Sequence, residues 1–404
     1  MEVKEGYKKT EIGVIPEDWE VEFVDNISDV KSGKRLPLGN YLMDTKTNYP
    51  YIRVADMFQG GVSLANIRYV PPNVYPTIKN YRIFKEDIFI SVAGTLGIVG
   101  VIPNELDGAN LTENADRLTS IKCDRDFLLY VFLSDLIQKR IEEERTLGAQ
   151  PKLALTRIRK FQIPLPPTKE EQKAIAEVLS DTDNLIQALE KRIAKKRLIK
   201  QGAMQKLLTP KDGWKVKKLG EIAEIVGGGT PNTFIKKYWN GRIQWFTPTE
   251  IGINKYVVKS IRKITVEGLK NSSARILPVG TVLLTSRAGI GDLSILKEGG
   301  CTNQGFQSLI AKKLITNEFL YYLMITLKNV LIQNASGSTF LEISPNRIKQ
   351  IDVSIPNCKK QSHIASILSD MDTEIETLEK KLAKYKQLKQ GLMQNLLTGK
   401  IRLV

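Results

Sequence analysis

A long segment occurs twice in this chain, and the two copies align without a gap. Residues 167–209 reappear as residues 356–398, with many aligned positions identical. The best-matched runs are Leu179-Ser180-Asp181 with Leu368-Ser369-Asp370 and Lys200-Gln201-Gly202 with Lys389-Gln390-Gly391. Self-similarity on this scale predicts a chain built from two copies of one structural unit.

Apolar residues recur in both copies in alternating steps of four and three, which is the a/d pattern of a coiled coil. No proline interrupts either pattern. We therefore expect two long helices that pair with each other as an antiparallel coiled coil. The predicted interface consists of Ile175, Leu179, Ile186, Leu189, Ile193, Ile364, Leu368, Ile375, Leu378 and Leu382.

The ends of the predicted helices carry their own signals. Thr168 and Glu171 have the spacing of a capping box, and Asn357 follows a proline where the second helix should begin. Gly202 and Gly391 lie inside the helical pattern, where glycine costs about 1 kcal/mol relative to alanine. Their recurrence indicates close approach of another backbone, from the second helix or from a partner protein, or else tolerated fraying near the helix ends.

A segment of mixed character precedes each helix, and the two segments begin alike, at 16–21 and 210–216. Each continues through a glycine-rich turn to a β-like run, at 88–92 and 282–286, and to a short helical pattern, at 127–136 and 319–327. The predicted fold class is α+β, with two globular α/β domains joined by two long helices in a pseudo-two-fold internal repeat. The predicted boundaries are 1–166 for the first domain, 167–209 for the central helix, 210–355 for the second domain and 356–404 for the C-terminal helix.

The formal net charge is +16 at pH 7. An excess of this size favours a polyanionic partner, nucleic acid first, with an acidic protein or a generally basic surface as the alternatives. The three cysteines are far apart and form no C-x-x-C pair, which predicts a reducing cytosol and no metal site. The one histidine, His363, aligns with Ala174, so we expect it on the surface. Residues 1–7 are charged and contain no apolar run, and no later run approaches 18 apolar residues, so we expect neither a signal peptide nor a membrane span.

Catalytic motifs are missing from the sequence. Neither glycine-rich turn, at 32–35 or 227–231, completes a P-loop. The Pro-Pro pairs at 71–72 and 166–167 do not fit the motif of adenine methyltransferases, and no carboxylate–lysine cluster points to a nuclease. We therefore expect a binding protein with no catalytic residue, no metal and no cofactor of its own.

The residues that border the repeat resemble those of the specificity subunit of a type I restriction–modification system. The resemblance rests on the opening at 12–19, the Ile-Pro-Leu-Pro-Pro run at 163–167, the helix start at 171–176 and the helix end at 200–209. The second copy repeats most of this pattern. It departs at 357–360, where Asn-Cys-Lys-Lys replaces the acidic first turn and weakens the second capping box.

This resemblance implies two target-recognition domains, each reading one half of a split, asymmetric DNA target, with the helix pair setting the spacer between the halves. It implies a cytoplasmic subunit without catalysis that binds double-stranded DNA and two copies of a modification subunit. That partner, an adenine methyltransferase, uses S-adenosylmethionine. In a full restriction complex, a motor-nuclease subunit that uses ATP and Mg²⁺ joins them.

Candidate DNA contacts are cationic and polar side chains in or beside turns, where binding residues concentrate. Arg, Lys, Asn, Gln and Thr can contact base edges, while Lys and Arg hold phosphates. For each candidate a solvated surface position is the alternative. The candidates are Lys31, Lys34, Arg35, Arg53 and Lys79 in the first domain, and Thr230, Asn232, Lys236, Lys237, Arg242, Arg287 and Gln304 in the second.

Overall fold

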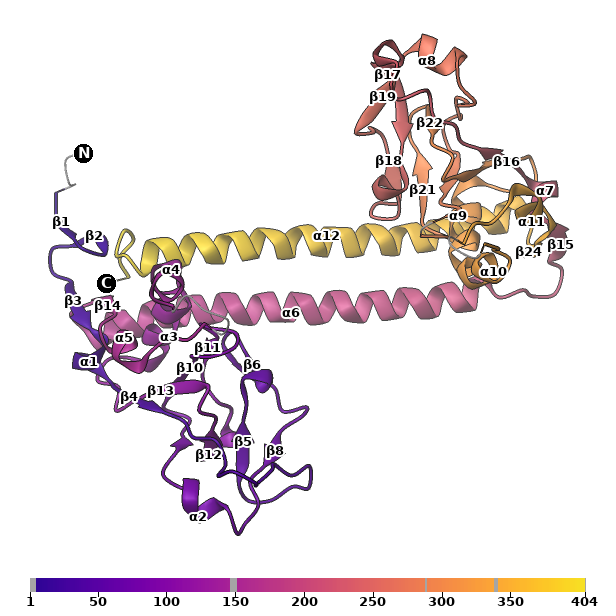
Figure 1. The fold of residues 1–404 in the computed structure, drawn as a ribbon. Helices are drawn as coiled ribbons and strands as arrows, with labels where there is room; N and C mark the ends of the chain where they lie inside the picture. Colours follow the sequence, from indigo (N-terminus) through magenta and orange to yellow (C-terminus); the bar gives the residue numbers. More distant parts are fainter. Residues whose placement is uncertain (1–4, 146–150, 288, 338–340, 404) are drawn as a thin grey trace. The chain divides into compact units, whose positions relative to one another are not determined.

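Two long helices run through the chain, α6 (Lys169–Leu208) and α12 (Cys358–Leu396). The computed structural model describes residues 5–145, 151–287, 289–337 and 341–403. Its backbone contacts divide it into two units, Met1–Glu190 with Lys381–Val404, and Lys191–Lys380. The division falls inside both helices, so each unit holds one globular domain and part of each helix (Figure 1). The predicted α+β class is confirmed.

Ion pairs show how the helices run within each unit. In the first unit, Lys389 lies 2.6 Å from Asp183 and Lys386 lies 2.6 Å from Glu190. In the second, Lys196 lies 2.7 Å from Glu374, and Lys200 pairs with Asp372. The partner's number falls as the residue number along α6 rises, so the pairing is antiparallel in both units, as predicted.

The apolar face of this helix pair is buried. Of the ten residues predicted for the coiled-coil interface, all but Leu382 are buried, and Leu382 is half-buried. His363 is exposed on α12. A Cβ built on Gly202 or Gly391 would meet no atom within 4 Å. Among the described residues, therefore, neither glycine serves a close approach of this chain's own backbone.

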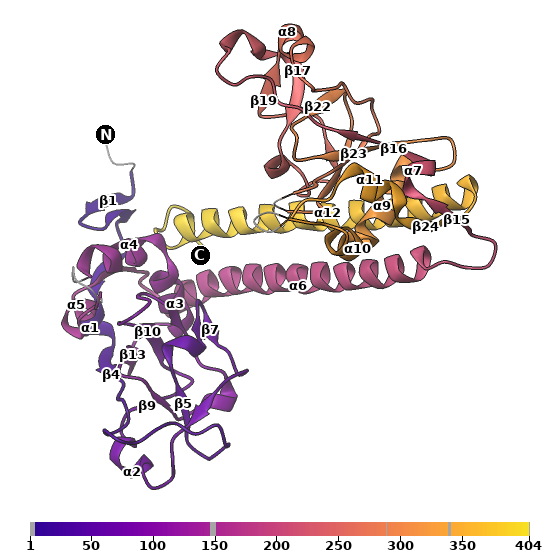
Figure 2. The ribbon, with the colours of Figure 1, turned by 45° about the vertical axis from the view of Figure 1, so that its right-hand side comes forward.

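The first domain is built on two four-stranded sheets, with strand orders β11-β10-β13-β4 and β8-β5-β12-β9. Several short helices lie between these sheets and the start of α6 (Figure 2). The elements are β1 (Tyr7–Thr10), β2 (Gly13–Pro16), β3 (Glu20–Phe23), α1 (Val24–Ile27), β4 (Asp29–Ser32), β5 (Pro50–Ile52), η1 (Val54–Asp56), β6 (Met57–Phe58), β7 (Gly61–Val62), β8 (Arg68–Tyr69), α2 (Tyr75–Ile78), β9 (Arg82–Ile83), β10 (Ile88–Ser91), β11 (Val99–Gly100), η2 (Asn104–Leu106), β12 (Ala109–Leu111), β13 (Ala115–Thr119), α3 (Arg125–Leu133), α4 (Asp135–Glu144), α5 (Leu155–Arg159) and β14 (Gln162–Leu165).

The second domain repeats this plan with a five-stranded sheet, β16-β23-β20-β21-β18, and a three-stranded sheet, β19-β17-β22. In both domains the second sheet contains one parallel pair, β5 with β12 and β17 with β22. The elements are β15 (Lys215–Lys218), α7 (Leu219–Ile222), β16 (Ala223–Gly227), η3 (Lys236–Tyr238), β17 (Trp239–Phe246), η4 (Pro248–Glu250), β18 (Tyr256–Val257), β19 (Arg262–Ile264), α8 (Val266–Lys270), β20 (Val282–Leu284), β21 (Leu293–Leu296), β22 (Gly300–Thr302), β23 (Gln307–Ala311), α9 (Asn317–Thr326), α10 (Lys328–Gln333), α11 (Pro345–Gln350) and β24 (Asp352–Ile355).

Each domain closes on itself before its helix begins. The opening strand pairs antiparallel with the closing strand, β3 with β14 and β15 with β24. Trp19 is fully buried in the first core, and Trp214 packs edge-on against Phe319 in the second, with ring centroids 6.2 Å apart. The similar openings seen in the sequence are therefore strands that return the chain to the start of a long helix.

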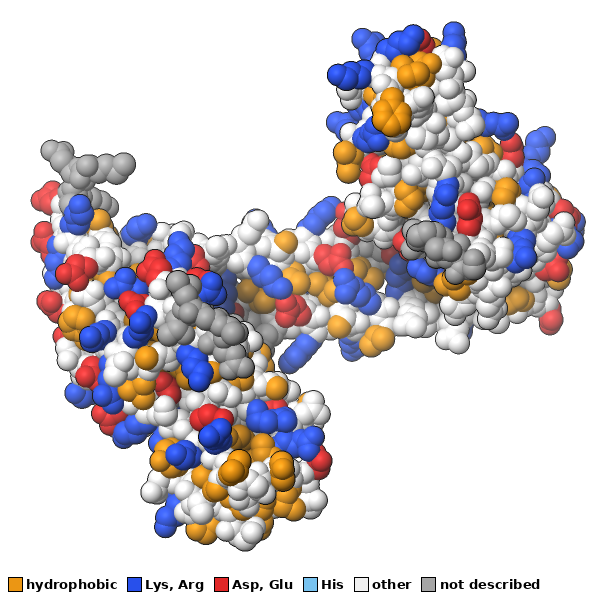
Figure 3. All heavy atoms as spheres, viewed as in Figure 1, with side chains coloured by type: hydrophobic (Ala, Val, Ile, Leu, Met, Phe, Trp, Pro, Cys, Tyr) orange, Lys and Arg blue, Asp and Glu red, His pale blue; other side chains and the backbone are white. Residues whose placement is uncertain are grey.

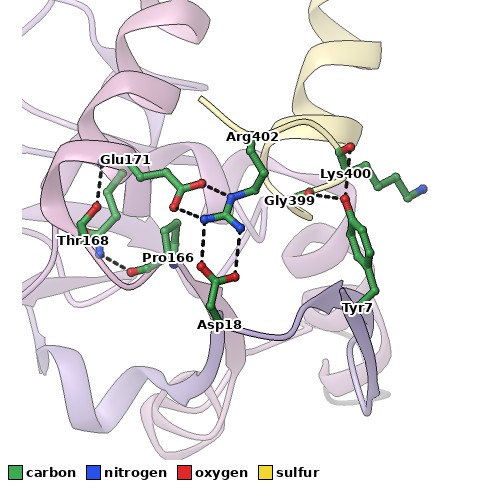
Figure 4. A network of polar contacts seen from close by, with 9 residues as sticks. Tyr7, Asp18, Pro166, Thr168, Glu171, Gly399, Lys400 and Arg402 are labelled. Atoms are coloured by element: carbon green, nitrogen blue, oxygen red, sulfur yellow. Dashed lines mark hydrogen bonds and ion pairs between the residues drawn. The ribbon is translucent and has the colours of Figure 1, made fainter. Parts of the chain in front are cut away.

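The C-terminal tail joins the first domain and corrects one expectation about capping (Figure 4). Thr168 accepts the Glu171 N–H at 3.2 Å, but the Glu171 carboxylate accepts from Arg402 at 2.5 Å, so the predicted capping box is only half formed. Arg402 also donates two hydrogen bonds of 2.9 Å to Asp18. Gly399, at φ +67°, permits this return, since a Cβ there would lie 2.4 Å from the Pro16 ring. Asn357 does cap α12, accepting the Lys360 N–H at 3.0 Å.

Within the described residues, no helix is long and apolar enough to cross a membrane.

Candidate nucleic-acid interface

In each domain a glycine begins the turn after the first strand of one sheet. These strands are β4 in the first domain and β16 in the second, and the glycine is buried in the first domain and half-buried in the second. Gly33 follows β4, and a Cβ there would lie 2.0 Å from the carbonyl oxygen of Thr112. Gly228 follows Gly227, the last residue of β16, and a Cβ there would lie 1.8 Å from the carbonyl oxygen of Asn303. Only glycine permits this approach of two backbone segments. The two turns are therefore equivalent points of the two domains.

An aromatic side chain from the second sheet holds each turn. The Tyr51 hydroxyl on β5 donates to the Lys34 carbonyl at 3.0 Å, and the Trp245 indole on β17 donates to the Gly229 carbonyl at 2.8 Å. Burial raises the pKa of the Tyr51 phenol to about 12, so it keeps its proton at neutral pH. The sequence did not point to these anchors, because one is Tyr, the other is Trp, and they lie outside the matched segments.

Four of the five candidates in the first domain are exposed. Lys34 and Arg35 follow Gly33 directly, and Lys79 lies at the end of α2. Lys31, on β4, lies 3.2 Å from Asp29, and its hydrogen bond lowers the pKa of that carboxyl group. These exposed cations can reach a phosphate or a base edge without leaving a core.

Arg53 differs from the other candidates. Its guanidinium binds the Asp56 carboxylate through two hydrogen bonds, of 2.9 and 2.7 Å, and donates to the Asn66 carbonyl at 2.8 Å. The hydrogen bond to Asp56 raises the pKa of Arg53. Arg53 thus stabilises the η1 turn, and contact with DNA would require it to leave Asp56.

Three candidates of the second domain come together at its glycine turn. The Thr230 hydroxyl hydrogen-bonds the Gln304 amide oxygen. Arg287 lies beside the same turn, since a Cβ built on Gly305 would be 3.8 Å from its Cγ. Asn232 is exposed, and its side-chain oxygen accepts the Phe234 N–H at 3.0 Å. Hydroxyl, amide and guanidinium groups therefore share one surface.

The remaining candidates flank this surface with positive charge. Lys237 lies 2.5 Å from Glu267, and the hydrogen bond to that carboxylate raises the pKa of the lysine. Lys236 on η3 and Arg242 on β17 are exposed. Within the parts of the chain that the structure describes, neither has a carboxylate within ion-pair distance.

A repeated contact ties each domain to the helix pair of its own unit. The Tyr130 hydroxyl on α3 donates to Asp183 at 3.0 Å, and Asp183 also pairs with Lys389. The Tyr322 hydroxyl on α9 donates to Asp372 at 2.6 Å, and Asp372 pairs with Lys200. Burial first, and then the neighbouring aspartate, raises the pKa of both phenols. Both aspartates and both lysines occupy matching positions of the sequence repeat, which is the signal that could have found them.

A groove lies at the end of a long helix in each unit, and we call these the helix-end grooves. One is lined by Gln201, Met204, Gln205, Leu208 and Thr209, with Ile325 and Thr326 opposite. The other is lined by Gln390, Met393, Gln394, Leu397 and Thr398, with Leu133 and Ser134 opposite. The five positions at the helix end are the same five in both copies of the repeat. The chain therefore presents one surface twice.

Among the described residues, no group of three or more His, Cys, Asp or Glu side chains could hold a metal ion.

A family model described as "Type I restriction modification DNA specificity domain" matches the chain twice, at residues 16–197 and 211–387. The MjaIX specificity subunit of Methanocaldococcus jannaschii is 42% identical over 175 residues, which are 42% of this chain and 40% of that relative. The putative MjaX specificity subunit of the same organism is 29% identical over 429 residues, which cover 99% of this chain and 97% of that relative.

Two solved structures share the fold. The S subunit of a type I restriction–modification system from M. genitalium has a TM-score of 0.61 at 18% identity and covers 98% of both chains. A chain from a study of complex assembly and conformational transition of the type I R-M system has a TM-score of 0.60 at 16% identity, covering 96% of this chain and 99% of that one.

Proposed function

Because this chain belongs to the family of type I restriction–modification specificity subunits, we propose that it selects the DNA target of such a complex by reading a split, asymmetric sequence. The first domain reads one half of the target and the second domain reads the other half. The chain itself contributes no catalytic group. The adenine methyltransferase that it directs uses S-adenosylmethionine, and a motor-nuclease subunit, where one joins, uses ATP and Mg²⁺.

The supporting observation is the different chemistry at the two equivalent glycine turns. The carbonyl held by the aromatic anchor belongs to Lys34 in the first domain and to Gly229 in the second. The side chains exposed at the first turn are those of Lys34 and Arg35, while the second turn presents Thr230 beside Gln304. Two like scaffolds with unlike side chains suit two unlike half-sites.

These side chains match the groups that DNA offers. An amide such as that of Gln304 can make two hydrogen bonds to adenine, and Arg35 or Arg287 can do the same to guanine in the major groove. Lysines such as Lys236 suit phosphates, which position the protein without reading sequence. The formal net charge of +16 favours binding of the DNA backbone.

The helix pair is the connection between the two readers. Both α6 and α12 continue without interruption from one unit into the other. We assign to this pair the spacer, meaning the number of unread bases between the two half-sites. The repeated helix-end grooves support docking of two copies of one partner, which we identify as the modification subunit.

The methylation pattern tests the proposed function. The chain would be coexpressed with its modification subunit in a host without other adenine methyltransferases, and methylated adenines would be mapped by sequencing. We expect a single motif with two different defined parts separated by a fixed number of unspecified bases. A continuous motif, or no methylation that depends on this chain, would refute the proposal.

The two helix glycines give a second prediction. Replacing Gly202 and Gly391 by alanine should stabilise the isolated chain by about 1 kcal/mol per site, because each site is open and alanine favours helix. Because Gly202 and Gly391 are next to Gln201 and Gln390, which line the helix-end grooves, the same change should weaken binding of the modification subunit at least tenfold. Denaturation and titration calorimetry measure the two effects. Thr377→Ala, at an exposed position of α12, is the control that should leave binding unchanged; equal partner affinity in all variants would contradict the docking assignment.

A further inference from the structure

Each domain carries a loop that begins at its buried or half-buried glycine and ends near a fully exposed apolar side chain. We call residues 33–42 and 228–235 the tip loops. Leu38 is 104% exposed and Tyr41 is 81% exposed in the first, and Phe234 is 93% exposed in the second. Single exposed apolar residues are ordinary on protein surfaces. Here an exposed apolar side chain follows the glycine turn of both domains, although the two domains differ in sequence, so the exposure is a repeated feature.

The base of each tip loop is held in place. Tyr51 and Trp245 donate to the carbonyls of equivalent residues, Lys34 and Gly229. In the second loop the Trp239 indole also donates to the Asn232 carbonyl at 3.1 Å, and the Asn232 side chain accepts the Phe234 N–H. Trp239 and Trp245 pack edge to face, with centroids 5.0 Å apart. Phe234 is thus presented on a supported loop and not folded back onto the domain.

The charge around the tip loops indicates what they meet. Lys34 and Arg35 are exposed on the first loop, and Lys236 and Lys237 follow the second directly. On the face shown in Figure 3, cationic and apolar side chains lie together on the first domain near α2 and on the second near α8 and β17. An apolar tip beside cations fits a polyanion with a stacked apolar interior, which describes duplex DNA.

We propose that the tip loops are wedges, with Leu38 and Phe234 each inserting between neighbouring base pairs of the half-site that their own domain reads. Apolar side chains that proteins insert into a base step from the minor groove partly unstack it and kink the duplex, and we expect the same of an apolar tip that enters from the groove its domain reads. This inference rests on the proposed function and adds to it a contact with stacked bases. Insertion would make the stiffness of the base step that receives the side chain part of the specificity of each half-site, because the free energy of deforming DNA depends on its sequence.

The wedge predicts a loss of affinity without a loss of charge contacts. For the complex with the modification subunit, bound to a duplex with the methylated motif, Phe234→Ala should raise Kd about tenfold, as expected for loss of one base–aromatic stack. Leu38→Ala should raise Kd about tenfold as well, because it removes buried apolar contact with the bases. The slope of log Kd against log salt should stay unchanged, since no phosphate contact is lost. Lys236→Ala should instead reduce that slope by about one. Val279→Ala and Val14→Ala, exposed apolar positions on other elements, should leave Kd unchanged.

A mismatch moved step by step through each half-site locates the wedge. The wild-type complex should bind most tightly when the mismatch weakens the inserted step, and Phe234→Ala should lose this preference in the second half-site only. If the wild type discriminates its motif while both tip variants bind as well as the wild type, the wedge is wrong and the proposed function stands. A change in salt slope, or weaker binding of the modification subunit instead of DNA, would also overturn the wedge. Failure of the wild type to discriminate the motif would remove the proposed function as well.

Discussion

Leu378→Lys is expected to lower the free energy of unfolding of the second unit by about 3 kcal/mol or more, because it places an unpaired ammonium group in a buried apolar seam. Leu378 is 8% exposed on α12. The helix pair in that unit carries the contacts of Lys200 and Asp372 that hold α9. The substitution should therefore loosen the attachment of the second domain as well as the seam.

Circular dichroism in urea measures this change, and Leu388→Lys provides the matched control. Leu388 lies on the same helix but is 49% exposed, so the same substitution there should change stability by no more than about 0.5 kcal/mol. In the assembled complex, Leu378→Lys should abolish methylation of the split motif or blur its spacing. Equal stability of the two variants would contradict the assignment of the seam.

The seam and the class of fold could be predicted because periodic patterns depend on local geometry. A helix repeats every 3.6 residues whatever surrounds it, so the spacing of Ile175 and Leu179 already determined which face is buried. The internal repeat then showed the same apolar spacing a second time, at Ile364 and Leu368. The short helices at 127–136 and 319–327 were predicted within a few residues of α3 and α9 for the same reason.

Contacts within each unit that join residues far apart in the sequence could not be predicted. Spacing alone assigned Glu171 to a capping box, whereas its carboxylate binds Arg402, which lies 231 residues away. The Arg402 guanidinium pairs with both oxygens of the Glu171 carboxylate, which a single backbone N–H cannot do, so it takes the carboxylate. The same limit applies to Arg53, which stays a candidate DNA contact but whose two bonds to Asp56 no spacing rule pointed to.

The tip loops show a different limit. Apolar residues in a turn pack inward or stay exposed depending on partners that no local pattern reveals. Leu36 is half-buried while Leu38, two residues later, is fully exposed. Charge and hydrogen-bonding capacity therefore pointed to the neighbouring residues of the tip loops and not to Leu38 and Phe234.

We propose that each domain reads its own half-site on a common frame. Replacing residues 211–355 with a second copy of residues 16–166 tests it, because both segments open and close with paired strands at the start of a long helix. The duplicated chain has two identical readers, and α6 and α12 run antiparallel within each unit.

The decisive measurement is the map of methylated adenines made by this duplicated chain with its modification subunit. We expect a symmetric split motif, in which the half-site of the first domain occurs twice in inverted orientation and the half-site of the second domain is absent. A motif that still contains the second domain's half-site, in a chain whose helices remain folded, would contradict it.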